Sequence, residues 1–335
     1  NNVISDESYQ KLQKLKKEFH TPISLKGSIY QRIKHYLFPR LETVTAVDEI
    51  DFTIQKGQRV AFIGPNGAGK STTIKMLTGI MYPTSGTIEV LGKSPAKNRK
   101  ALSYEMSAVF GHSSKLWYHL PVQESYDLLA AVYDVPKAIY QNRLNELVNK
   151  FDIAHLLTKP VRQLSLGERM RCEIVASFLH KPKVVFLDEP TIGLDLTAKA
   201  IIRDLLRQLS KEEGTTLLLT SHDIDDIEMV CDRVIMIDKG KLILDDQLVH
   251  LKTRYIKKKV IQIIAEEESI AWNQEGVDVL EYSPHRLKME VDLDKCSSEK
   301  VISALLKSYT IKDITIEDPS LETIIKIFYA KQVSC

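Results

Sequence analysis

The sequence predicts a protein of the α/β class, in which a parallel sheet is covered by helices and a smaller α+β domain follows. Three short apolar runs have the continuous hydrophobicity of strands that are buried on both faces, and they lie at Arg59–Ile63, Val184–Leu187 and Thr216–Thr220. Helix-like segments at 70–80 and 196–209 follow two of these runs. After residue 251 apolar and charged residues alternate, as at 287–293, which is typical of antiparallel strands with one exposed face.

Length and composition set limits on the function. The chain has 335 residues, enough for two domains, and its 44% apolar and 27% charged residues are those of an ordinary globular protein. The longest apolar runs are far shorter than the roughly 20 residues that cross a bilayer, so a membrane role would be peripheral. A net charge of +2 gives no general attraction for nucleic acid, which is not expected as a partner. The four cysteines lack metal-ligand spacing and no export signal is present, so we expect reduced thiols in the cytoplasm.

One segment is strongly basic. Residues 11–40 contain eight Lys or Arg against a single acid, Glu18. Within this segment, apolar residues fall on one face of a possible helix, namely Ile29, Ile33, Tyr36 and Leu37. Such a helix either lies on an anionic membrane surface or packs its apolar face on its own domain. The sequence leaves both alternatives open.

The first apolar run leads into a glycine-rich loop with the spacing G-x-x-x-x-G-K-S. The backbone N–H groups of such a loop point at a polyphosphate, and the helix that follows adds the positive end of its dipole. Lys70 can reach the terminal phosphates, and the hydroxyl of Ser71 can bind Mg²⁺. The sequence therefore predicts a nucleoside triphosphate site, with phosphate-binding residues Gly64, Pro65, Asn66, Gly67, Ala68, Gly69, Lys70, Ser71 and Thr72.

Polar residues end the two other apolar runs. Asp188 and Glu189 follow the second run, where Asp188 can hold Mg²⁺ and Glu189 can accept a proton from an attacking water. His222 follows the third run and can hydrogen-bond the terminal phosphate. One helix and one strand fit between residues 188 and 222, so we expect these strand ends to be neighbours. The predicted catalytic residues are thus Glu189, His222 and Lys70, with Ser71 and Asp188 at the metal.

At Leu164-Ser165-Leu166-Gly167-Glu168 a serine-containing turn opens another helix, and this fragment resembles the LSGGQ signature of ATP-binding-cassette (ABC) ATPases. The phosphate loop, the signature-like turn, the acidic strand end, the Gly193-Leu194-Asp195 turn and His222 follow one another in the order of that family. The resemblance covers roughly residues 40–250 and is closest to ATPase subunits of the daunorubicin-resistance-like bacterial exporters.

The resemblance implies a fold, a reaction and partners. The expected fold is an ABC-type nucleotide-binding domain with a RecA-like core, an antiparallel β subdomain and an α-helical subdomain at about 122–180. Two subunits, identical or different, would enclose two ATP molecules, with Ser165 and Gly167 of one subunit touching the γ-phosphate held by the other. ATP and Mg²⁺ would be the cofactors, and transmembrane permease subunits would hold the protein at the cytoplasmic face of the membrane.

The chain departs from the family pattern at three points. Leu166 and Glu168 replace a Gly and the Gln of the signature, and an acid near phosphate is unfavourable unless it faces away. His112 stands where the family has a Gln that contacts Mg²⁺ or water, so it is a further metal-site candidate. The residue that stacks on adenine stays open between Phe38 and Leu41.

We expect the nucleotide-binding domain to span 1–250 and a C-terminal α+β domain, for dimerisation or regulation, to span 251–335. The C-terminal part is predicted to contain strands at 260–265 and 314–317, a helix at 299–306, and a last helix entered through Asp318-Pro319. The expected function is ATP hydrolysis that drives a multi-subunit exporter. The alternative is an ABC ATPase that acts on a ribosome, nucleic acid or assembly complex.

Overall fold

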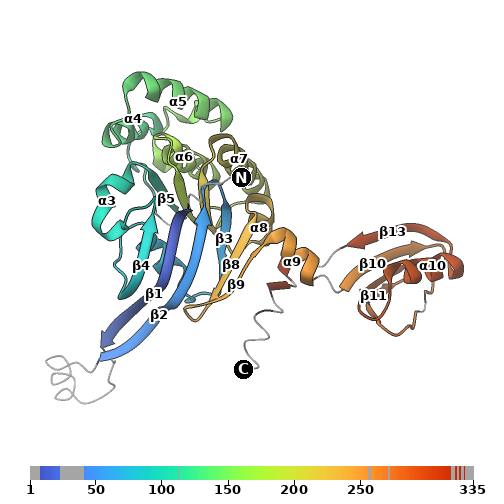
Figure 1. Ribbon diagram of the computed structural model, residues 1–335. Coiled ribbons are helices and arrows are strands. Elements are labelled where there is room, and N and C mark those ends of the chain that lie inside the picture. Colours follow the sequence, from blue (N-terminus) through green and yellow to red (C-terminus); the bar gives the residue numbers. More distant parts are fainter. Residues whose placement is uncertain are drawn as a thin grey trace, which may run out of the picture. The chain divides into compact units, whose positions relative to one another are not determined.

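The computed structural model describes residues 8–22, 41–111, 113–255, 258–270, 272–317, 321–322, 324–325 and 328. The chain divides into two compact units, Asn1–Asp245 and Asp246–Cys335, a division five residues before the domain boundary that the sequence suggests. Figure 1 shows the elements of each unit. His112, Phe38 and the apolar residues of the predicted basic helix at 29–37 lie outside the described residues, as does the side chain of Leu41.

A six-stranded sheet with the strand order β5-β6-β7-β3-β8-β9 forms the centre of the first unit. Its strands are β3 (Arg59–Ile63), β5 (Met106–Phe110), β6 (Val184–Asp188), β7 (Thr216–Thr220), β8 (Arg233–Asp238) and β9 (Lys241–Gln247). The pairs from β5 through β8 are parallel. Because Asp188 pairs with Thr220, the ends of β6 and β7 lie side by side, which confirms the expected neighbourhood of the two strand ends.

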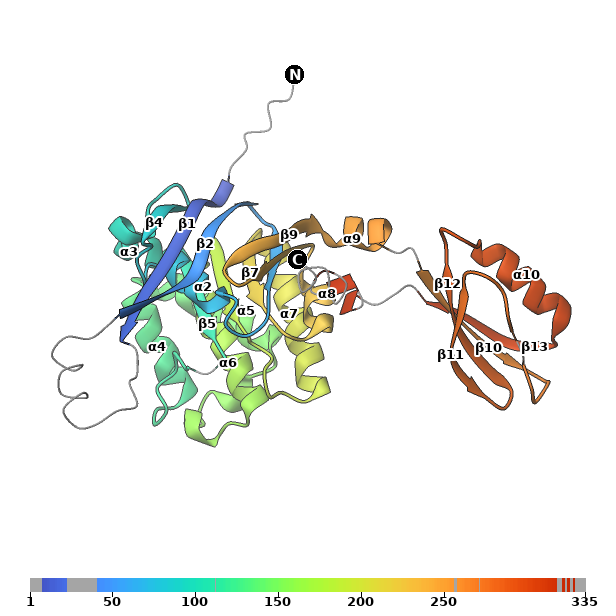
Figure 2. The same ribbon diagram turned by 90° about the horizontal axis from the view of Figure 1, so that it is seen from below.

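Helices cover both faces of this sheet. Figure 2 shows α2 (Lys70–Leu77) on one side and α7 (Leu196–Glu213) with α8 (Ile224–Val230) on the other. The helix α2 ends three residues earlier than its predicted end at Ile80, because Thr78 and Gly79 close it with C-terminal hydrogen bonds and Gly79 has a φ of 70°. Ile80 is consequently not part of the packed helical face and is 48% exposed.

An antiparallel sheet with the order β2-β1-β4 packs over α2. It consists of β1 (Ser8–Pro22), β2 (Leu41–Gln55) and β4 (Ser85–Val90), and α3 (Pro95–Ser103) follows it. Leu12, Leu15, Ile74 and Phe62 belong to one buried apolar cluster that joins this sheet, α2 and the central sheet. The basic run that begins at Lys11 therefore starts in a strand.

A helical segment lies between β5 and β6 in the sequence. It contains α4 (Val122–Val132), α5 (Lys137–Lys150), two short 3₁₀ helices (Ala154–Leu156 and Val161–Gln163) and α6 (Leu166–Phe178). Figure 1 shows α4 and α5 at one end of the unit. The helix α6 contacts β5, α4, α5 and α7, so the turn that opens it is anchored to the central sheet.

The second unit has its own sheet and core. After α9 (Leu248–Tyr255), a sheet of order β11-β12-β10-β13 forms from β10 (Lys258–Ala265), β11 (Val277–Ser283), β12 (Arg286–Asp292) and β13 (Ile311–Glu317). The helix α10 (Ser298–Ser308) packs on it through Val301 and Leu305. The sequence did not indicate β11, in which apolar and polar residues fail to alternate strictly. The predicted entry to a last helix at Asp318-Pro319 lies outside the described residues, although 321–322, 324–325 and 328 are helical.

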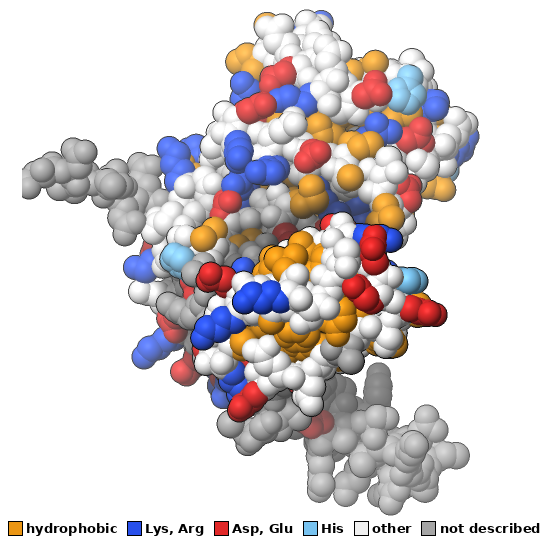
Figure 3. All heavy atoms as spheres, turned by 90° about the vertical axis from the view of Figure 1, so that its right-hand side faces the viewer, with side chains coloured by type: hydrophobic (Ala, Val, Ile, Leu, Met, Phe, Trp, Pro, Cys, Tyr) orange, Lys and Arg blue, Asp and Glu red, His pale blue; other side chains and the backbone are white. Residues whose placement is uncertain are grey.

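Exposed apolar side chains are a feature of this second unit. Figure 3 faces the unit and shows hydrophobic side chains gathered on it, with charged side chains around them. The large exposed apolar residues of this unit come from α9, β11, α10 and β13, and they are Val249, Val279, Leu280, Tyr282, Leu306 and Ile316. Within the part of the chain that the structure describes, no helix is long and apolar enough to cross a membrane.

Candidate functional site

The phosphate loop, residues 64–71, joins β3 to α2 and is shaped by two glycines that touch neighbouring backbone. A Cβ atom at Gly64 would lie 2.4 Å from the carbonyl oxygen of Ile237, and one at Gly69 would lie 2.3 Å from the carbonyl oxygen of Ala46. Gly69 also has a φ of 106°, which favours glycine. Any side chain at these two positions would displace the loop, so its conformation depends on β8 and β2 behind it.

Lys70 lies at the start of α2 and is nearly buried. Its Nζ donates to the carbonyl oxygens of Gly64 at 2.5 Å and Pro65 at 3.2 Å. Burial lowers the pKa of Lys70, while the charges of Glu189 and Asp188 oppose this shift. The ammonium group therefore stands inside the phosphate loop, next to two carboxylates, where it can pair with phosphate.

Asp188, at the end of β6, directs its two oxygens to different partners. One oxygen accepts a hydrogen bond from Thr220 Oγ1 at 2.6 Å, and the other lies 3.3 Å from Ser71 Oγ. The serine hydroxyl and the second carboxylate oxygen thus converge on one point. Hydroxyl and carboxylate oxygens suit Mg²⁺, which usually takes one or two protein oxygens and completes its shell with phosphate and water.

Glu189 has an unusual backbone and a polar neighbour. Its φ is 54°, a conformation that costs a non-glycine residue free energy and that is often found at functional sites. Its Oε1 lies 3.3 Å from His222 Nε2. Burial raises the pKa of Glu189, and the charges of His222 and Lys70 oppose this rise. Oε1 is buried and accepts no hydrogen bond from any described residue, so it is available to a bound water.

These groups surround one open cavity of about 380 Å³. Its predicted lining residues are Pro65, Asn66, Gly67, Gly69, Lys70, Ser71, Thr72, Asp188, Glu189 and His222, and its remaining lining residues are Ala46 and Ile192. Gly64 and Ala68 are buried behind the loop. The structure therefore brings together the phosphate loop, the acid pair and the histidine that the sequence places far apart.

The signature turn, residues 164–168, lies at a second cavity of about 560 Å³. This cavity is lined by residues of the signature turn, by Arg171 of α6, and by residues of the Gly193–Asp195 turn and of the first turns of α7. It shares no lining residue with the first cavity. Ser165 and Gly167 are thus placed in a cavity other than the one that contains the phosphate loop. Leu166 lies against Gly193, where a Cβ atom would come within 3.1 Å of its Cδ2.

Glu168 is used for helix capping. Its carboxylate accepts a hydrogen bond from the backbone N–H of Ser165 at 2.8 Å, and the Ser165 hydroxyl accepts one from the N–H of Glu168 at 3.2 Å. The hydrogen bond from the Ser165 backbone lowers the pKa of Glu168. The sequence signal for this reciprocal capping box is Ser-x-x-Glu before a helix, which is also part of the signature-like motif.

Thr220 was also missed by the sequence analysis. Besides its hydrogen bond to Asp188, Thr220 accepts hydrogen bonds from the backbone N–H of Glu189. The acceptors are its carbonyl oxygen and its hydroxyl oxygen, each at 3.1 Å. A threonine at the end of an otherwise leucine-rich strand was the available signal, since a buried hydroxyl needs partners. Thr220 therefore orients both acids.

We predict that Glu168→Ala lowers the stability of the protein, whereas Glu168→Gln largely preserves it. Alanine leaves the Ser165 N–H without its acceptor and should cost about 1 kcal/mol, but the Gln carbonyl can replace the carboxylate. Because the pKa of Glu168 is lowered in the folded state, its charge stabilises the fold above the ordinary Glu pKa, and this contribution is lost as the pH falls through the lowered value.

Thermal unfolding at neutral and acidic pH measures this effect. The Glu168→Ala midpoint should fall by about 2–4 °C at pH 7, and the gap to the parent should narrow in acid. Equal midpoints for the Ala variant and the parent at pH 7 would show that the cap contributes nothing to stability.

Several known ATP-binding proteins are similar to this chain. The family described as "ABC transporter" matches residues 47–192. The bacitracin transport ATP-binding protein BcrA of Bacillus licheniformis is 32% identical over 72% of this chain and 78% of its own length. A daunorubicin resistance ATP-binding protein of Streptomyces coeruleorubidus is 33% identical over 62% of this chain and 65% of its own. The solved structure of cbiO1 from Clostridium perfringens, part of an ABC transporter complex, has a TM-score of 0.60 and 27% identity over 75% of this chain and 93% of its own.

Proposed function

Because the chain belongs to the ABC transporter family of ATP-binding proteins, we propose that it is the ATP-hydrolysing subunit that powers a multi-subunit exporter. ATP binding and ATPase activity are properties of this family, and the phosphate loop and acid pair fit them. The exporter assignment is supported by relatives whose names refer to bacitracin transport and daunorubicin resistance.

The observation that carries the proposal is the separation of the two halves of the site. The phosphate loop lines one cavity, and Ser165 with Gly167 lines another. A helix N-terminus that is capped by Ser165 can still offer its N–H groups and the serine O–H to an anion. In our proposal, each signature turn completes the site of a second subunit, so that ATP closes the dimer and hydrolysis opens it.

Five polar residues of the first cavity have proposed roles in this reaction. Lys70 neutralises charge on the terminal phosphates, and Glu189 accepts a proton from the attacking water. His222 holds the terminal phosphate and the water in line. Ser71 and Asp188 would hold Mg²⁺, which supplies charge neutralisation on the β- and γ-phosphates when it is bound.

The proposed partners are transmembrane permease subunits, which would place the chain at the cytoplasmic face of the membrane. Purification of the tagged full chain from solubilised membranes tests this. Stable integral membrane proteins in the purified complex support the exporter, whereas ribosomes or nucleic acid in their place would favour the alternative class of ABC ATPase.

For the second unit we propose a role in dimer contact or regulation. Its exposed apolar side chains on β11, including Leu280 and Tyr282, support this proposal, because such clusters are often contact sites. The double variant Leu280→Asp/Tyr282→Asp should weaken the ATP-bound dimer and leave ATP binding intact. The control is a double change to Asp at two exposed apolar residues of α4, Leu128→Asp/Val132→Asp. Unchanged dimerisation of the β11 variant, measured by native mass spectrometry, would rule out a dimer contact.

A further inference from the structure

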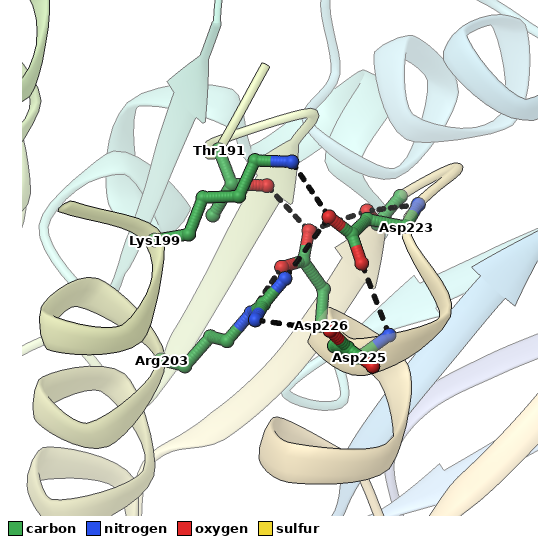
Figure 4. A network of polar contacts seen from close by, with 7 residues as sticks. Thr191, Lys199, Arg203, Asp223, Asp225 and Asp226 are labelled. Atoms are coloured by element: carbon green, nitrogen blue, oxygen red, sulfur yellow. Dashed lines mark hydrogen bonds and ion pairs between the residues drawn. The ribbon is translucent and has the colours of Figure 1, made fainter. Parts of the chain in front are cut away.

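A buried carboxylate joins the turn after β6 to the turn after β7. Asp226, on α8, is 1% exposed. Its Oδ2 accepts hydrogen bonds from the hydroxyl groups of Thr191 and of Ser221, the latter at 2.5 Å. Its Oδ1 accepts from Arg203 Nε at 2.6 Å. Figure 4 shows Thr191 and Arg203 directed at the carboxylate of Asp226.

The two hydroxyl groups come from positions next to the reaction site. Thr191 is two residues after Glu189, and Ser221 directly precedes His222. A single oxygen of Asp226 therefore holds both turns, and the 3.3 Å between Glu189 Oε1 and His222 Nε2 depends on how they are held. Neither Thr191 nor Asp226 lines the nucleotide cavity, so both would act through the residues beside them.

Arg203 fixes the carboxylate from the opposite side. It lies on α7, and its NH2 group is 3.0 Å from an oxygen of Asp223 on the loop before α8. Lys199, one turn earlier on α7, donates to the same Asp223 oxygen at 2.6 Å. The helix α7 itself begins at Leu196, directly after Asp195, whose side chain caps it. The network therefore fixes the position of α7, which follows the Gly193–Asp195 turn, relative to the segment that contains His222.

Energetics favour a role in positioning over a role in stability alone. A buried ion pair gives back little more than the cost of removing its charges from water, so apolar residues of similar volume would often stabilise a fold as well. Apolar side chains could not bind two hydroxyl groups and a guanidinium in fixed directions. The Arg203–Asp226 pair therefore contributes directional hydrogen bonds that fix the positions of the two turns.

We propose that Asp226 and Arg203 are positioning residues for ATP hydrolysis, which set the distance between Glu189 and His222 and link it to the Gly193–Asp195 turn. This inference rests on the roles proposed above for Glu189 and His222. Without the pair, the two turns are free to separate. Because a displacement of about 1 Å at a reacting centre can cost on the order of 100-fold in rate, the chemical step should slow while nucleotide binding by the phosphate loop is preserved.

The test compares the kinetics of matched variants of the full chain. Arg203→Met removes the charge and the donors but keeps the length of the side chain. We expect it to lower kcat for ATP by about 10- to 100-fold and to change KM by less than about twofold. Arg203→Lys keeps a charge that can pair with Asp226 and should recover part of the loss. Thr191→Val and Ser221→Ala remove one hydroxyl each and should give smaller losses.

The control is a second buried arginine that lies elsewhere in the same unit. Arg143 on α5 has a side chain that is 2% exposed and pairs with Glu213 at 2.6 Å, while that of Arg203 is 6% exposed. Arg143→Met should lower the thermal midpoint and leave kcat unchanged. The concentration of folded sites, counted by nucleotide-binding stoichiometry, normalises kcat in every variant, so partial unfolding does not imitate a catalytic effect.

The outcomes separate this inference from the function that it rests on. If normalised kcat is unchanged in Arg203→Met, or falls equally in Arg143→Met, Arg203 does not position the site. Loss of turnover in Glu189→Gln, measured in parallel, would then still support Glu189 as the base. If Glu189→Gln itself turns over ATP normally, the role assigned to Glu189 is wrong, whatever the arginine variants do.

Discussion

Replacing Glu189 with Gln should abolish ATP turnover and preserve ATP binding. The amide has the size of the carboxylate, but it cannot take a proton from water, and loss of general-base catalysis costs about 100- to 10,000-fold in rate. The phosphate loop and Lys70 are unchanged in this variant, so the affinity for ATP should remain close to that of the parent. Phosphate release and equilibrium binding of a fluorescent ATP analogue measure the two properties separately.

The position of Glu189 also predicts a pH dependence. Burial raises the pKa of this carboxyl group, and only its ionised form accepts a proton. As the pH falls, turnover should therefore decline at a higher pH than an ordinary Glu would require. Glu212→Gln, a change at an exposed carboxylate of α7, is the matched control and should behave like the parent. Substantial phosphate release by Glu189→Gln would mean that another group is the base.

The second large effect is expected at the signature turn. In the Glu189→Gln background, where bound ATP should not be hydrolysed, Ser165→Asp should weaken ATP-dependent dimerisation. Asp caps a helix as well as Ser does, so α6 should keep its start, but its negative charge would face the phosphate of the other subunit. Like charges about 4 Å apart repel by about 1 kcal/mol even in water and by more in a closed interface, so the dimer should weaken at least about fivefold.

Ser165→Asn provides the control for this charge. Asn is an equally good cap and is neutral, so it should weaken the dimer far less than Asp. Sedimentation velocity with Mg²⁺ and ATP distinguishes the monomer from the dimer in each variant. Because Ser165 does not line the cavity of its own phosphate loop, ATP binding by the monomer should be equal in both variants. A Ser165→Asp protein that dimerises like the parent would contradict contact of Ser165 with the partner's nucleotide.

The sequence predicted those parts of the fold whose signal is local. The strands β3 and β7 match their predicted bounds, since a continuous apolar run between turn residues has few alternative structures. The end of α2 was predicted too late because Ile80 continues the helical spacing of Ile74 and Leu77, although Gly79 closes the helix before it. The strand β11 was missed because it lies at the edge of its sheet, where both faces are largely exposed and the alternation that marks a strand is not required.

The site shows the same division. The phosphate loop and the acid pair are contiguous in the sequence, so their chemistry could be predicted from spacing alone. Contacts such as that of Thr220 with Asp188 join residues 32 positions apart. The partners of Asp226 come from three separate segments, and nothing in the surrounding residues marks that acid among its acidic neighbours as the buried one. Only the folded structure shows which of these similar carboxylates is buried.

The close approach of Gly64 to Ile237 and of Gly69 to Ala46 affects how the phosphate loop could be transplanted. The carbonyl groups that pack against the loop and fix its conformation come from β8 and β2, which are strands of two different sheets. Grafting the eight-residue peptide onto a foreign strand–helix junction would transfer the sequence of the loop but not the backbone carbonyl groups that pack against it. A transplanted phosphate loop should therefore keep its conformation only if β2 and β8 are transplanted with it.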